Sequence, residues 1–296
     1  MKKPTPLFFT LIMLGIILVL WVNPVKTSNP LTSILYITGI TVSLSFLFGL
    51  ITGDYSWTDR LWSTMPVVFA WIYALHGGFS TPLLVASILV TLWGLRLTFN
   101  FARRGGYTKT EDYRWQILHT KITNPVVWQL FNLGFIAFYQ QILFIAFTSP
   151  LYLLSMHGLR MDMTLSLWLV SFLLLVFLAI ETIADQQQYT FHQSKNGLLP
   201  RRPQWEEQYQ RGFCSSGLFA RSRHPNYLGE LGVWFCLYIF ASLAIGDFFN
   251  WSLVGPLALT LLFISSTIFT ESITERKYST YQQYKKQASA IIFKFW

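Results

Sequence analysis

The residues with the clearest chemical potential lie in one polar stretch, from Arg221 to Glu230, which leads directly into a long apolar run. Asn226 and Glu230 are four residues apart, so they share one face if this stretch begins a helix. A helix N-terminus beside Arg221 and Arg223 can bind a phosphate or diphosphate. Because a carboxylate at the edge of hydrocarbon must face something polar, the stretch predicts the rim of a buried ligand site that opens onto one membrane face.

Other polar residues interrupt the apolar runs on the same predicted side. Glu181 and Asp185 again have a spacing of four, which indicates either a solvated helix end or acceptors for hydroxyl and amide groups of a ligand. Arg96 lies inside an apolar run and needs either a buried partner or a route to the headgroups. Glu271 and Glu275 end a further apolar run, and the segment from there to residue 288 predicts an amphipathic helix on the membrane surface.

The composition indicates the elements that must position these residues. The chain has 296 residues, of which 53% are hydrophobic and only 12% are charged, against about 25% charged residues in soluble domains. The sequence therefore predicts an all-α polytopic membrane helix bundle. The formal charge is +9, and the basic residues cluster in loops between the apolar runs, which predicts a lipid bilayer as partner and no nucleic acid.

The apolar runs define about eight transmembrane helices. Lysine and arginine are concentrated in alternate loops, so we expect both termini to face the cytoplasm. We also expect the first two helices, residues 1–52, to form an N-terminal pair. The eight predicted spans are Pro6–Val22, Leu31–Ile51, Leu61–His76, Pro82–Ala102, Pro125–Ser149, Thr164–Ala184, Tyr227–Gly246 and Trp251–Thr270.

Common catalytic motifs are missing from the sequence. There is no Walker loop, no HExxH motif, no GxGxxG fingerprint and no Ser-His-Asp arrangement. The two cysteines, Cys214 and Cys236, lack metal-ligand spacing, and Cys236 is expected to be a packing residue. We therefore expect no metal, and we expect a ligand site built from helices with a lipophilic small-molecule substrate.

Several stretches resemble the steroid 5α-reductase-like integral membrane family. They are Gly217-Leu218-Phe219, the run Arg223–Glu230, Trp93–Thr98, Glu111–Trp115 and Glu181–Gln187. Together with Asp59–Ser63, these stretches cover most of the chain from about residue 55 onward. The resemblance makes residues 53–296 a reductase-like transmembrane domain, with its cofactor half at about residues 180–290.

The resemblance implies NADPH-dependent reduction of a carbon–carbon double bond in a lipophilic substrate such as a steroid, sterol, enoyl or isoprenoid lipid. Trp93 stands where steroid reductases carry a tyrosine, and its indole N–H can donate a hydrogen bond but cannot act as a proton acid. Asp59 is the substitute for the glutamate partner of that tyrosine, so Asp59 and Trp93 are the predicted catalytic positions. The residues implied in cofactor binding are Arg96, Arg103, Arg104, Asp185, Arg221, Arg223, His224, Asn226, Tyr227, Glu230, Arg276 and Tyr278.

Two alternatives stay open at the level of sequence. Isoprenylcysteine carboxyl methyltransferases also carry Arg-His-Pro before a tyrosine and a glycine, so the chain is alternatively an S-adenosylmethionine-dependent lipid or prenylcysteine methyltransferase. A non-catalytic membrane protein or a transporter is the other alternative, although no paired broken helices of the transporter kind occur. The expected location is a bacterial inner membrane, or the endoplasmic reticulum in a eukaryote.

Overall fold

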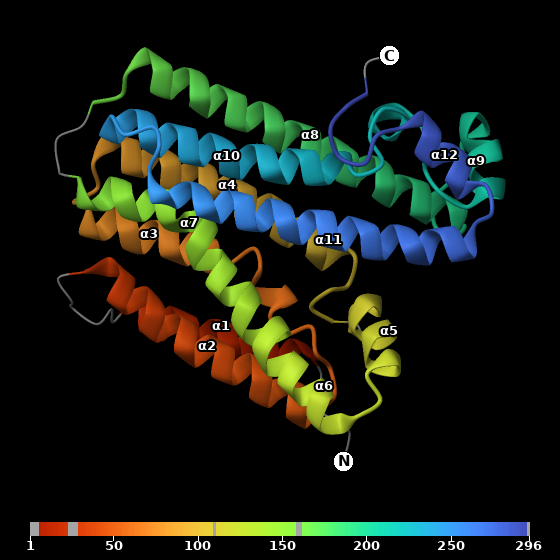
Figure 1. Ribbon diagram of the computed structural model, residues 1–296, viewed down its shortest axis with the longest axis horizontal. Coiled ribbons are helices and arrows are strands. Elements are labelled where there is room, and N and C mark those ends of the chain that lie inside the picture. Colours follow the sequence, from red (N-terminus) through yellow and green to blue (C-terminus); the bar gives the residue numbers. More distant parts are fainter. Residues whose placement is uncertain (1–5, 23–28, 109–110, 158–161, 295–296) are drawn as a thin grey trace. The chain divides into compact units, whose positions relative to one another are not determined.

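The computed structural model describes residues 6–22, 29–108, 111–157 and 162–294, and these ranges are helical with no β-strand. Figure 1 shows the course of the chain and its helices. The helices are α1 (Pro6–Val22), α2 (Pro30–Thr52), α3 (Met65–His76), α4 (Thr81–Arg103), α5 (Tyr113–Lys121), α6 (Pro125–Phe131), α7 (Gln140–Met156), α8 (Leu165–Lys195), α9 (Glu206–Arg211), α10 (Pro225–Ile245), α11 (Val254–Lys277) and α12 (Tyr281–Gln287).

Short helical segments join several of these helices. A π-helical segment, η2 (Asn132–Tyr139), makes α6 and α7 continuous. The remaining short segments are 3₁₀-helical: η1 (Asp59–Leu61), η3 (Pro203–Trp205), η4 (Gly217–Ala220) and η5 (Trp251–Leu253).

Six helices in the described ranges are long and apolar enough to cross a membrane. They are Pro30–Thr52, Thr81–Arg103, Pro125–Met156, Leu165–Lys195, Pro225–Ile245 and Trp251–Lys277. The two other predicted spans correspond to shorter apolar helices, Pro6–Leu20 and Met65–His76. The all-helical multi-pass architecture is therefore confirmed, while the number eight and the cytoplasmic termini remain predictions.

The chain forms two compact units. The first comprises residues up to Trp168 together with Leu237–Pro256, and the second comprises Leu169–Cys236 together with residues 257–296. Within the first unit, α3 packs against α4 and α7, and α2 packs against η2 and α7. The buried Gln141 joins two of these helices, because Thr41 Oγ1 donates to its Oε1 at 2.5 Å.

Helix α8 is the longest uninterrupted α-helix of the described chain, and Figure 1 shows it in green. Its 31 residues correspond to about 46 Å at the usual helical rise. A hydrocarbon core is about 30 Å thick, so α8 continues well beyond the apolar layer. Its polar last third, from Asp185 to Lys195, belongs to the second unit, which also holds most of the predicted site residues.

Candidate functional site

Two glycines bring α10 close to α8 within the second unit. A Cβ atom on Gly229 would lie 2.6 Å from the Cβ of Glu181, and one on Gly232 would lie 2.2 Å from the ring of Phe177. Only glycine therefore allows this approach without displacement of the neighbouring helix. Gly229 faces Glu181 and Gly232 faces Phe177, so residue numbers fall along α8 as they rise along α10. The two helices therefore run antiparallel.

This antiparallel register brings the predicted polar residues of the two helices together. Asn226 precedes Gly229 by about one turn, and Asp185 follows Glu181 by about one turn, so Asn226 and Asp185 lie at the same level. Glu181, Asp185 and Glu230 are all buried. Glu230 accepts a hydrogen bond of 2.9 Å from Trp234 Nε1. We call Glu181, Asp185, Asn226 and Glu230 the polar seam.

A pocket of about 270 Å³ lies along the extension of α8, where its lining begins at Gln186, the residue after Asp185. Gln186, Gln187 and Thr190 of α8 line one side, and the loops that follow α8 contribute Arg202 and Trp205. The guanidinium of Arg202 lies 4.6 Å from the centroid of the Trp205 ring. We call this space the loop pocket; its wall thus combines amides, two hydroxyls, a thiol, an aromatic ring and one cation.

Gly217 also lines the loop pocket. Its φ of +61° is left-handed, and a Cβ there would lie 2.6 Å from Gln187 Nε2. Gln187 Oε1 in turn accepts a hydrogen bond of 3.1 Å from the backbone N–H of Leu218. These contacts link Gly217-Leu218 to Gln187, which lies 30 residues earlier in the sequence. The sequence indicates these residues only through the family resemblance, and it does not predict that they line a pocket.

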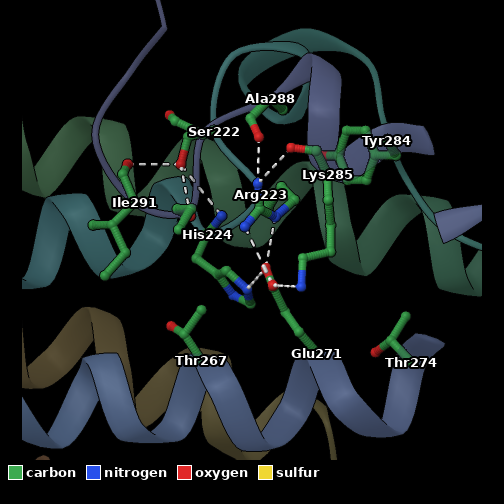
Figure 2. A network of polar contacts seen from close by, with 12 residues as sticks. Ser222, Arg223, His224, Thr267, Glu271, Thr274, Tyr284, Lys285, Ala288 and Ile291 are labelled. Atoms are coloured by element: carbon green, nitrogen blue, oxygen red, sulfur yellow. Dashed lines mark hydrogen bonds and ion pairs between the residues drawn. The ribbon is translucent and has the colours of Figure 1, made fainter. Parts of the chain in front are cut away.

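Three basic side chains contact the carboxylate of Glu271 (Figure 2). Arg223 donates from Nε to Oε1 at 2.6 Å and from Nη2 to Oε2 at 3.2 Å. His224 Nε2 lies 3.1 Å from Oε1, and Lys285 Nζ lies 3.2 Å from Oε2. Lys285 also reaches Glu275 Oε1 at 2.5 Å. We call these five residues the Glu271 network.

The guanidinium of Arg223 forms hydrogen bonds with other groups of the protein. Besides Glu271, it donates from Nη1 to the backbone carbonyl of Lys285 at 3.2 Å and to that of Ala288. The predicted phosphate contact of Arg223 would have to compete with these partners. The observed geometry gives Arg223 a different task, because it joins α10, α11 and the segment after α12 at one point. His224 stacks on Tyr227, with ring centroids 5.0 Å apart.

The other predicted cofactor residues of the second unit lie outside the polar seam. The side chains of Arg221 and Arg276 are exposed. Tyr278 lies just after α11, and its hydroxyl accepts a hydrogen bond of 3.3 Å from Lys195 Nζ. Burial acts to raise the pKa of Tyr278, but the hydrogen bond and the charge of Lys195 outweigh it and lower the pKa below its usual value.

The predicted catalytic residues belong to the first unit. Gly94 of α4 packs against the segment after η1, because a Cβ there would lie 2.7 Å from the backbone oxygen of Ser63. The neighbouring Trp93 is fully buried. Asp59, in η1, accepts a hydrogen bond of 2.6 Å from Trp115 Nε1. Burial outweighs the nearby Arg114 and raises the pKa of Asp59 to about 6.

The arginines predicted on α4 occupy different environments. Arg96 is partly buried, one turn from Trp93, and Arg104 is exposed at the end of the helix. Arg103 donates from Nε and Nη2 to Asn100 Oδ1, at 3.0 and 2.7 Å. The structure therefore brings Trp93 and the Asp59 segment together inside the first unit, and gathers Asp185, Asn226 and Glu230 inside the second.

Comparisons with known proteins agree over most of the chain. The family described as "Protein of unknown function (DUF1295)" matches residues 45–288. An uncharacterized protein of Schizosaccharomyces pombe is 32% identical over 260 residues, which cover 82% of this chain and 75% of that protein. No solved structure matches the chain. The family match spans far more than half of the residues, and the chain therefore belongs to the DUF1295 family.

Proposed function

We propose that this protein is a membrane-embedded, NADPH-dependent oxidoreductase that reduces a carbon–carbon double bond of a lipophilic substrate. The observation that carries the proposal is the polar seam together with the loop pocket, which follows it along α8. Three buried carboxylates and Asn226 lie on two closely packed helices that are apolar enough to cross a membrane. Buried charges of this kind are costly in a membrane protein and mark functional sites by default.

The shape and chemistry of this arrangement suit an elongated dinucleotide. Carboxylates accept hydrogen bonds, so the seam fits the carboxamide and ribose hydroxyls of a nicotinamide nucleoside. The loop pocket offers Trp205 for stacking and two glutamine amides for the edge of a base. From Glu181 to Thr190 the helix rises by about 14 Å, so one extended ligand can reach both regions.

The division of work follows from this fit. NADPH, when bound, supplies a hydride to an activated double bond. Asn226 and Glu230 would hold the nicotinamide end, and Asp185 would hold the sugar beside it. Gln186, Gln187 and Trp205 would hold the adenosine end, with Arg202 beside the phosphates. The close α8–α10 packing excludes water from the seam, and a site on membrane-crossing helices receives its second substrate from the lipid.

The sequence resemblance supports the same activity. The run Arg223–Glu230 and the stretch Glu181–Gln187 resemble steroid 5α-reductase-like proteins, and both stretches contribute to the polar seam. Trp93 replaces the tyrosine of steroid reductases, so we propose a double bond in a lipid other than a 3-oxosteroid. Trp93 itself is fully buried in the first unit.

The proposal is tested by ligand-induced stabilisation of the detergent-purified protein with NADPH, NADH and S-adenosylhomocysteine. A ligand at about a hundred times its Kd adds about 2.7 kcal/mol to the free energy of unfolding, so we expect NADPH to raise the melting temperature clearly. Glu230→Gln keeps an oxygen for Trp234 Nε1 but removes the charge, and we expect it to weaken NADPH binding by at least tenfold, like Asn226→Ala.

Glu207→Gln provides a matched control, because this carboxylate is 81% exposed on α9. We expect the control to bind NADPH like the unmodified protein. A shift with S-adenosylhomocysteine instead of NADPH would identify the methyltransferase alternative. Equal NADPH shifts in the Glu230→Gln variant and the control would show that the polar seam is not the cofactor site.

A further inference from the structure

The segment after α12 returns to the start of α10. The backbone N–H groups of Arg223 and His224 donate to the carbonyls of Ser289 and Ala290, at 2.9 and 3.0 Å. The N–H of Lys294 donates to the carbonyl of Arg221 at 3.0 Å. These backbone bonds hold the returning segment, residues 288–294, in a defined position.

A second pocket, of about 400 Å³, lies between α12 and this returning segment. Its wall carries four basic side chains, Arg223, Lys285, Lys286 and Lys294, together with the apolar Ile292 and Phe293. It shares no lining residue with the loop pocket. We call it the basic pocket.

The charges around the basic pocket do not cancel. Glu271 and Glu275 offset Arg223 and Lys285, which they contact directly. In the part of the chain that the structure describes, neither Lys286 nor Lys294 forms an ion pair with a carboxylate, and Lys294 Nζ only donates to the backbone oxygen of Lys286 at 3.3 Å. Two positive charges therefore face the pocket without compensation, which selects an anion.

The position and the apolar wall indicate where this anion comes from. The candidate membrane span α11 ends at Lys277, and α12 follows at Tyr281, so the pocket lies beside the end of a membrane-crossing helix. Ile292 is 73% exposed next to the lysines. Cations beside exposed apolar side chains at a membrane surface match a phospholipid, whose phosphate and acyl chains need both.

We propose that the basic pocket binds the phosphate group of an anionic phospholipid. Lys286 and Lys294 contact the phosphate, and Ile292 and Phe293 lie against the upper part of the acyl chains. Arg223 lines the pocket but does not contact the phosphate, because its donors already bind Glu271 and two backbone carbonyls. Lipid binding at this site requires neither NADPH nor catalysis, so it can be tested independently of the proposed reductase activity.

The test measures lipid binding to the full chain in a neutral detergent, by native mass spectrometry and by melting temperature. The probes are phosphatidylglycerol, phosphatidylcholine and inorganic phosphate. We expect phosphatidylglycerol to bind and stabilise more than the other two. The double variant Lys286→Gln and Lys294→Gln removes both uncompensated charges and should weaken phosphatidylglycerol binding by roughly thirtyfold.

The control removes two exposed lysines outside the pocket, Lys121→Gln and Lys277→Gln, and we expect it to bind like the unmodified protein. An NADPH-induced shift in each variant, if the unmodified protein has one, and an unchanged melting temperature without lipid, show that folding is intact. Equal phosphatidylglycerol binding by both double variants would overturn the proposal. Full stabilisation by inorganic phosphate alone would overturn the lipid as ligand and identify free phosphate.

Discussion

In each unit, carboxylate side chains link segments that are distant in the sequence, but the groups that contact these carboxylates differ between the two units. In the second unit, Glu271 is contacted by Arg223, His224 and Lys285. In the first unit, Asp59 and Glu111 accept hydrogen bonds from neutral donors, the indole of Trp115 and the backbone N–H of Tyr55, at 2.6 and 2.9 Å. Both arrangements tie distant segments together, over 48 residues in one case and 56 in the other.

The difference lies in what happens to the charge. A carboxylate among cations keeps its charge, and removal of the carboxylate leaves buried cations without compensation. A buried carboxylate among neutral donors favours its protonated form, because burial disfavours the charge. The pKa of Asp59 is accordingly raised to about 6 and that of Glu111 to about 7. We therefore expect the stability of the second unit to depend on the charge of Glu271, and the stability of the first unit to depend on pH.

The largest effect should come from Glu271→Ala. This variant leaves Arg223, whose side chain is 8% exposed, without its counter-charge. Loss of one partner of a buried ion pair lowers the free energy of unfolding by about 3–5 kcal/mol. Thermal unfolding in detergent measures this loss.

Glu275→Ala is the matched comparison, because Glu275 forms an ion pair with Lys285 among the described residues and is 27% exposed. Its loss should cost less than about 1 kcal/mol. If the two variants were equally stable, the Glu271 network would not be what fastens the returning segment.

The next effect should be a pH dependence that belongs to the first unit. The pKa values of Asp59 and Glu111 lie above their ordinary values of 3.8 and 4.5. The folded state thus binds more protons than the unfolded state between about pH 4 and 7, and stability falls as the pH rises through this window. We expect a higher melting temperature at pH 5 than at pH 8 for this contribution.

The double variant Asp59→Asn and Glu111→Gln keeps an acceptor oxygen at both positions but cannot titrate. The melting temperature of this variant should vary less between pH 5 and 8 than that of the unmodified protein. Parallel curves would show that other groups cause the pH dependence and would remove the contrast between the two units.

The smallest effects should be equal in both units. Ser222 Oγ donates to the carbonyl of Ile291 at 2.7 Å, and Ser56 Oγ accepts from the N–H of Asp112 at 2.8 Å. Both serines are buried, and replacement of either by alanine should cost about 1 kcal/mol. Because neither bond carries a net charge, the cost should be the same at pH 5 and pH 8. A cost that changes with pH in one unit would indicate coupling to its carboxylates.

The sequence predicted the helices well because hydropathy is a local property. Each of the eight predicted spans falls on a helix, and α10 begins at Pro225, two residues before the predicted span Tyr227–Gly246. The buried position of Cys236 is also confirmed. The number of membrane crossings is harder to predict, since Met65–His76 has only 12 residues and helix length alone does not decide whether such a segment spans a bilayer.

The candidate site was predictable only within single helices. A spacing of four indicated that Glu181 and Asp185 share a face, but it does not indicate which helix lies opposite. The partnership of Arg223 with Glu271 spans 48 residues, and no local pattern carries it, so Arg223 was interpreted as a phosphate ligand. The glycines at 229 and 232 were the available signal for close packing against α8, because small residues allow membrane helices to approach.

The backbone bonds between residues 221–223 and the segment 289–294 have a consequence for biosynthesis. Arg223 is translated 48 residues before Glu271 of α11 and 65 residues before Ala288 of the returning segment. Until residue 288 has been added, Arg223 lacks at least one of the two carbonyls, those of Lys285 and Ala288, to which its guanidinium donates. A chain whose synthesis has passed Glu271 but not yet reached Ala288 therefore holds the Arg223 guanidinium against its carboxylate without the full set of carbonyl acceptors.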